Sequence, residues 1–150
     1  IGRKEDLIMS EEEIKELFLK GLDCSQVVSE NFSNELGFDK EFMRKMSACF
    51  GGGMMRGETC GSVIAALMVI GLKYGHFKED DVEQKQIMRE KSEEFKKKFL
   101  EMHESTMCKE LLGYDLSKPE ELGLALESGR LFDFCPKLTK ETIDILKEIL

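Results

Sequence analysis

The chain has 150 residues, of which 41% are hydrophobic and 35% charged, enough for one soluble globular domain with its own core. Its 30 acidic and 22 basic residues give a net charge of −8, which argues against general attraction to a nucleic-acid backbone. The longest apolar run, residues 63–72, is too short to cross a bilayer. We therefore expect neither nucleic acid nor a membrane as a partner.

The first third of the chain predicts three helices, each introduced by a residue that favours helix N-termini. Ser10 precedes the first helix and Gly21 ends it. Asp23 introduces the second, which ends before Gly37, and Asp39 introduces the third. Short polar side chains accept hydrogen bonds from free amides at helix starts, while glycine ends helices readily. The predicted helices cover residues 11–20, 24–36 and 40–49.

A glycine-rich segment and the most apolar helix follow. Gly51, Gly52 and Gly53 would be unfavourable inside a helix, so residues 50–58 are expected to form a loop. Thr59 then offers a hydroxyl N-cap for a helix over residues 60–74 that is apolar on nearly all sides. Such a helix is typical of the centre of a protein.

The second half predicts one long charged helix and three shorter ones. A helix opened by Asp80 or Asp81 should reach about residue 104, and Thr139 should cap the last one. Because Cys135 precedes Pro136, its backbone is expected to be extended. The remaining short helices are expected over residues 106–112 and 120–127.

These elements predict an all-α fold: a single domain over residues 1–150, with six to eight helices around the helix of residues 60–73. Residues 1–9 are expected to be disordered or an artificial addition. The acidic surface and the narrow apolar stripe of the long helix, residues 80–104, suggest protein contacts and a homodimer formed through that helix.

Five cysteines are the compositional feature that most requires an explanation: Cys24, Cys49, Cys60, Cys108 and Cys135. A secreted disulfide scaffold is usually shorter, has a poorer core and carries an even number of cysteines. The odd count and adequate core favour free, metal-bound or redox-cycling thiols in a reducing compartment, so we expect a cytoplasmic protein. The absence of C-x-x-C excludes a thioredoxin-like motif.

Cys60 and Cys24 both fall at predicted helix starts, where backbone N–H groups and the helix dipole stabilise a thiolate. Gly61 and the glycines of residues 51–57 would let backbone approach a sulfur or a bound group closely. The alternative for Cys60 is a small core residue beside an ordinary turn, and the local sequence weighs both equally. For Cys108, in a short helical stretch, the local sequence by itself favours a small buried packing residue beside Leu111 and Leu112.

Together these residues resemble a known family of redox-active proteins, C_GCAxxG_C_C, which has four characteristic cysteines and a C-G-A-x-x-G motif. The stretches that carry the resemblance are G-L-D-C-S-Q-V-V at 21–28, F-G-G-G-M at 50–54, E-T-C-G-S-V-I-A-A-L-M-V-I-G-L at 58–72, C-K-E-L-L-G-Y-D-L at 108–116 and C-P-K-L at 135–138. The motif differs at two positions, where Ser62 and Ala65 stand for its alanine and final glycine. The family is related to a segment of split-Soret cytochromes.

The resemblance implies that four cysteines form one redox or metal site: Cys24, Cys60, Cys108 and Cys135. They would serve as redox thiols with a partner protein, or as ligands of an iron–sulfur cluster or of an iron or zinc ion. Glycines beside the site would bind the cofactor: Gly51, Gly52, Gly53 and Gly61. Cys49 is an extra thiol, and covalent haem is not expected because C-x-x-C-H is missing. The alternative function is a non-catalytic helical interaction domain with structural cysteines.

Overall fold

The computed structural model describes residues 8–150, and this part of the chain is all-α, as predicted. Extended pairing among these residues is limited to one isolated bridge between Thr59 and Met107. The α-helices are α1 (Glu11–Leu19), α2 (Cys24–Asn31), α3 (Ser33–Leu36), α4 (Lys40–Ser47), α5 (Gly61–Tyr74), α6 (Val82–Met102), α7 (Cys108–Leu112), α8 (Pro119–Glu127) and α9 (Arg130–Ile149). Shorter helical turns are η2 (Ala48–Phe50) and η3 (Gly53–Gly57).

The described residues contain one helix more than expected because the second predicted helix is divided into α2 and α3 at Phe32. The hydroxyl of Ser33 donates to the backbone oxygen of Glu30 at 2.8 Å, a local bond that competes with regular helical pairing. The predicted N-caps Ser10, Asp39 and Asp81 each accept a hydrogen bond from a backbone N–H of the following helix.

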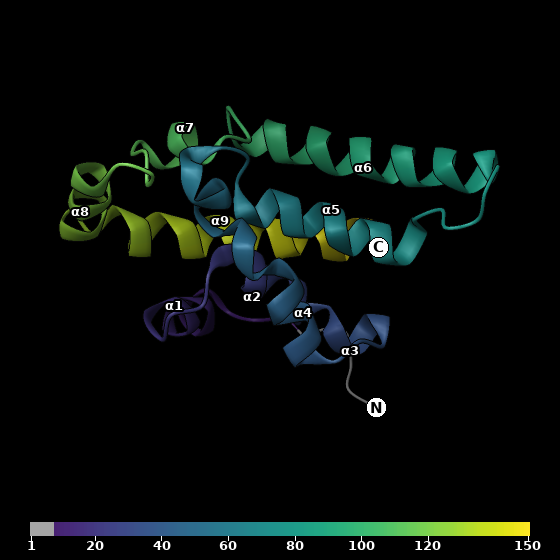
Figure 1. Cartoon of the computed structure of the whole chain (residues 1–150), viewed down its shortest axis with the longest axis horizontal. Helices are drawn as coiled ribbons and strands as arrows, with labels where there is room; N and C mark the ends of the chain where they lie inside the picture. The colour runs from purple at the N-terminus through teal and green to yellow at the C-terminus, as the bar shows by residue number, and fades with distance from the viewer. Residues whose placement is uncertain (1–7) are drawn as a thin grey trace.

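The helices form three layers whose long members run roughly parallel (Figure 1). The long helix α6 lies along one side, α5 and α9 occupy the middle, and α1 to α4 cover the other side. Helices α7 and α8 lie together at one end of the bundle. The middle layer therefore receives side chains from both sides, and the core includes Val63, Val69, Phe95, Phe99 and Ile143, all nearly inaccessible to solvent.

The C-terminal part of the prediction was wrong in its backbone geometry. Helix α9 begins at Arg130, so Cys135 is helical rather than extended and Pro136 lies inside the helix. Thr139 is fully buried and caps nothing. Pro136 lacks the N–H that would donate to the preceding turn, so the local sequence disfavours a helix at this point. Packing of the long apolar face that follows outweighs this cost.

The helix starts around the glycine-rich loop also differ from the prediction. Cys60 rather than Thr59 is the N-cap of α5, and Met107 is the N-cap of α7. Thr59 is drawn into the bridge with Met107, and two backbone hydrogen bonds accompany this bridge. They run from the N–H of Cys60 to the oxygen of Thr106 at 2.7 Å, and from the N–H of Cys108 to the oxygen of Glu58 at 2.6 Å.

The loop expected over residues 50–58 contains a left-handed turn. Gly52, Gly53, Met54 and Met55 all have φ between 55° and 64°. Two of these residues are methionines, and an L-residue in this conformation costs about 1–2 kcal/mol. The turn is therefore held by the surrounding structure rather than by local preference.

Three further predictions concern residues 1–9, a membrane-spanning helix and a homodimer. Residues 1–7 lie outside the described residues, whereas Ile8 and Met9 pack against the core. Among residues 8–150, no helix is long and apolar enough to span a membrane. The expected homodimer through α6 stays a prediction.

Candidate functional site

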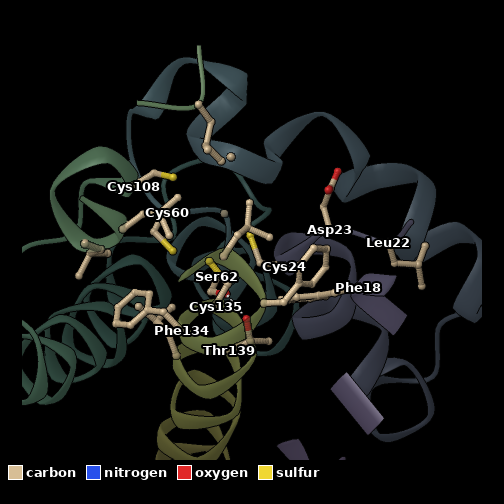
Figure 2. A pocket seen from close by; sticks show the side chains of 18 of the residues that line it. Phe18, Leu22, Asp23, Cys24, Cys60, Ser62, Cys108, Phe134, Cys135 and Thr139 are labelled. Carbon is tan, nitrogen blue, oxygen red and sulfur yellow. Dashed lines mark hydrogen bonds between the residues drawn. The ribbon is translucent and has the colours of Figure 1, made fainter. Parts of the chain in front are cut away.

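Four cysteines line one cavity of about 180 Å³ at the end of the bundle where α7 lies. Cys24 is the first residue of α2, Cys60 the N-cap of α5, Cys108 the first residue of α7, and Cys135 lies in the second turn of α9. Figure 2 shows their side chains converging on the same space from four different elements. Thiols that are far apart in the sequence are thus neighbours in the fold.

Cys24 and Cys60 meet at the start of α5, where a Cβ atom on Gly61, the residue after Cys60, would lie 2.7 Å from the Sγ of Cys24. The neighbouring side chain of Cys60, followed by burial, holds the pKa of Cys24 well above its usual range, and the backbone N–H of Gly52 opposes the shift. Cys24 therefore keeps its proton at neutral pH. All five cysteines are free thiols in this structure.

Cys108 and Cys135 form the other side of the cavity. Burial, with smaller contributions from the charges of Cys24 and Asp115, raises the pKa of Cys108 to about 11. Burial also raises the pKa of Cys135, and the guanidinium of Arg130 partly offsets this effect. Both are protonated thiols at neutral pH. Attack by a thiolate would therefore begin elsewhere in the site.

The bridge between Thr59 and Met107 explains why Cys60 and Cys108 lie side by side. It pairs the segment that leads into α5 with the segment that leads into α7, and the amides of both cysteines are bonded across it. Two helix starts are thereby fixed at one point, although α6 lies between them in the sequence.

The predicted glycines allow the backbone to approach these sulfurs. A Cβ atom on Gly61 would lie 2.7 Å from the Sγ of Cys24, and one on Gly53 would lie 2.9 Å from the Cβ of Cys108. Gly52 lines the cavity directly, as does Gly61. Gly51 packs against Asp23, whose Cβ would be 2.5 Å from an added Cβ. The structure thus places them as close-packed neighbours of the cysteines, and their part in binding a cofactor stays a prediction.

Two polar features of the site were not predicted. The hydroxyls of Ser62 and Thr139 share a fully buried hydrogen bond of 3.0 Å that joins α5 to α9 at the cavity wall. Arg130 donates to the backbone oxygens of Leu112 at 3.1 Å and Leu111 at 3.0 Å, tying α9 to α7. The sequence carried one signal that Thr139 belongs to the site: it lies four residues after Cys135, a spacing that places both side chains on one face of a helix.

The four thiols as placed do not form a metal site. Among residues 8–150, no group of three or more Cys, His, Asp or Glu side chains is arranged to hold a metal ion. Thiolates suit zinc or an iron–sulfur cluster chemically, but the sulfurs as placed do not form a ligand set. Cys49 is exposed and does not line the cavity.

A sequence profile of the family described as "Putative redox-active protein (C_GCAxxG_C_C)" matches residues 22–149. The chain belongs to this family. The matched range includes all four cavity cysteines. No curated protein and no solved structure matched the chain.

The two departures from the C-G-A-x-x-G motif are accommodated in this family member. Ser62 and Ala65 are both fully buried in α5. The hydroxyl that Ser62 adds is paired with Thr139, which removes the penalty of burying an unpaired polar group. Ala65 has helical neighbours on both sides, so this position does not require the conformational freedom of glycine.

Proposed function

We propose that this redox-active family member works by dithiol–disulfide exchange, with Cys24 and Cys60 as the working pair. The observation that carries the proposal is the close approach of the Cys24 sulfur to the start of α5, where Cys60 is the N-cap, on a cavity that both side chains line. Two thiols at this separation need little movement to form a disulfide. The cavity beside them supplies space for the other sulfur compound.

The positions and surroundings of the two thiols assign them different tasks. Cys60 is the nucleophile, since it lies at the start of the fourteen-residue helix α5, whose dipole favours negative charge, whereas the pKa of Cys24 is held well above its usual range. Its thiolate attacks one sulfur of a disulfide, forming a mixed disulfide and releasing a thiol. Cys24 then attacks the Cys60 sulfur and releases the second thiol. Two cysteine thiols become one disulfide, and one disulfide becomes two thiols.

The other two cysteines have a supporting part in this proposal. Cys108 and Cys135 keep their protons at neutral pH because burial raises the pKa of each. They surround the working pair with neutral, weakly polar groups that exclude water. A redox partner protein then returns two electrons and two protons to the Cys24–Cys60 disulfide.

The test is disulfide mapping after oxidation of fully reduced protein by a simple disulfide under anaerobic conditions. We expect a Cys24–Cys60 bond in the wild type and in Cys49→Ala. Cys24→Ala should instead accumulate a mixed disulfide on Cys60, and Cys60→Ala should form neither product. Four thiols that resist oxidation in the folded protein would contradict the proposal and favour a structural role for the cysteines in an interaction domain.

A metal centre is the second candidate, because four sulfurs facing one cavity are the donor set that zinc and iron–sulfur clusters use. The sulfurs would have to move to ligate, given the arrangement of the described residues. Metal analysis of protein purified anaerobically separates the candidates. Stoichiometric zinc or iron that is lost in Cys60→Ala and kept in Cys49→Ala would favour the metal centre.

A further inference from the structure

The cavity beside the working pair is lined mainly by carbon. Aromatic and aliphatic side chains from several elements surround the sulfurs, among them Phe18, Leu22, Leu116, Phe132, Phe134 and Leu138. The buried hydroxyls of Ser62 and Thr139 are paired with each other, so they offer an incoming molecule little hydrogen bonding. Figure 2 shows Phe18 and Phe134 on opposite sides of the cysteines. The walls therefore favour an apolar occupant.

The size of the cavity limits what it can enclose. Its volume is about 180 Å³, slightly more than the apolar cavities of about 150 Å³ that hold benzene. A molecule of about six to eight non-hydrogen atoms fits this space. The tripeptide disulfide of glutathione or a folded protein's disulfide loop is too large to be enclosed.

The charge around the cavity limits its occupant further. Asp23 is the one charged side chain among the described residues that line it, and the whole chain carries a net charge of −8. The guanidinium of Arg130 lies over the Phe134 ring, 4.0 Å from its centroid, and donates to backbone oxygens of α7. An anionic thiol compound therefore meets like charge at Asp23 and finds no cation among the lining side chains. A cationic compound could approach Asp23, but its charge would lose water among carbon walls at a large cost in free energy.

We infer that the oxidant of the Cys24–Cys60 pair is a small uncharged dialkyl disulfide, which binds in the cavity with its sulfurs against Cys60. This inference rests on the proposed function and specifies its substrate class. With diethyl disulfide, the Cys60 thiolate displaces one ethanethiolate, which takes the Cys24 proton. The Cys24 thiolate then displaces the second ethanethiolate, which takes a proton from water. One diethyl disulfide and two cysteine thiols give two ethanethiols and one protein disulfide.

The test is the single-turnover oxidation rate of fully reduced protein with four disulfides: diethyl disulfide, neutral bis(2-hydroxyethyl) disulfide, dicationic cystamine and glutathione disulfide. Each rate is divided by the rate of the same disulfide with free dithiothreitol, which removes intrinsic reactivity. We expect diethyl disulfide to exceed the other three by at least about tenfold. Similar ratios for all four, or a higher ratio for a disulfide-bonded protein such as insulin, would overturn the inference but leave the exchange chemistry intact.

Two variants test the contribution of the cavity to the oxidation rate without changing any thiol. Leu116→Trp places a larger side chain at the half-buried wall beside Gly52 and should lower the diethyl disulfide rate about tenfold. Leu124→Trp alters an exposed leucine on α8 that does not line the cavity and should leave the rate unchanged. Equal rates in both variants would overturn the inference.

Benzene supplies a readout that needs no redox chemistry. NMR shifts of cavity residues on adding benzene should appear in the wild type and in Cys60→Ala, and disappear in Leu116→Trp. Benzene binding without oxidation of the pair by any disulfide would overturn the proposed function and, with it, the substrate assignment. Oxidation without benzene binding would overturn only the cavity as the substrate site.

Discussion

Gly61 offers the sharpest test of how tightly the site is packed. A methyl group at this position would lie 2.6 Å from the backbone oxygen of Phe50 and 2.7 Å from the sulfur of Cys24. The sulfur can rotate away, but the carbonyl belongs to the η2 turn and moves only with the backbone. Gly61→Ala should therefore force the glycine-rich loop away from α5 and separate Cys24 from Cys60.

The magnitude follows from two opposing effects. Overpacking a close contact costs about 1–3 kcal/mol, while replacing glycine by alanine in a helix favours folding by about 0.5–1 kcal/mol. We expect a net loss of about 1–2 kcal/mol in the free energy of unfolding. The matched control is Gly71→Ala in the same helix, where nothing lies within 4 Å of the added Cβ. That variant should gain about 0.5–1 kcal/mol.

Urea denaturation of both variants measures the free energies, and thermal unfolding should separate their midpoints by several degrees, since 1 kcal/mol corresponds to about 2–4 °C at this chain length. Gly61→Ala should also slow formation of the Cys24–Cys60 disulfide, whereas Gly71→Ala should not. If both variants are stabilised alike, the close approach of Cys24 to α5 is not a feature of the folded protein.

Three further predictions concern the thiols and the loop. The free energy of unfolding should fall as pH rises from about 9 to 11. The reason is that the pKa of Cys108 is raised to about 11 in the folded state, whereas an unfolded thiol has a pKa of about 8.5. In urea denaturation at each pH, Cys108→Ala should flatten this part of the stability profile. Arg130→Met should cost about 1 kcal/mol through its lost bonds to α7. It should also shift alkylation of Cys135, followed by mass spectrometry, to higher pH, because the guanidinium lowers the pKa of that thiol; an unchanged alkylation profile would contradict this. Met55→Gly should raise the free energy of unfolding by about 0.5–1 kcal/mol. Met55 is largely exposed and has a φ of 55°, a conformation that glycine adopts without strain. A loss of stability in urea would show instead that the Met55 side chain holds the turn.

Features set by neighbouring residues were predictable from the sequence. Asp39 caps α4 and accepts from the N–H of Phe42 at 3.1 Å, a bond that involves residues three positions apart. The placement of Cys24 and Cys60 at helix starts also followed from local signals. No short spacing links the four cysteines, so their convergence was expected from the family resemblance together with two helix starts beside a glycine-rich loop.

Features set by distant residues were not predictable. The extended backbone expected at Cys135 followed from Pro136, yet α9 continues through both because its apolar face is packed against α1, α2, α5 and α6. The hydroxyl of Thr139 could have capped a helix, but it shares a hydrogen bond with the hydroxyl of Ser62, 77 positions away in the sequence. A local pattern cannot show which of two uses a polar side chain will have.

The bridge between Thr59 and Met107 also has a consequence for motion. It closes the open end of the hairpin formed by α5 and α6, and the amides of Cys60 and Cys108 are both bonded across it. Breaking it would free both amides in one local opening event, so they should exchange with solvent deuterium at similar rates. Cys60 and Cys108 would then become accessible to solvent together, and the rate of this single opening event would set how often both are exposed.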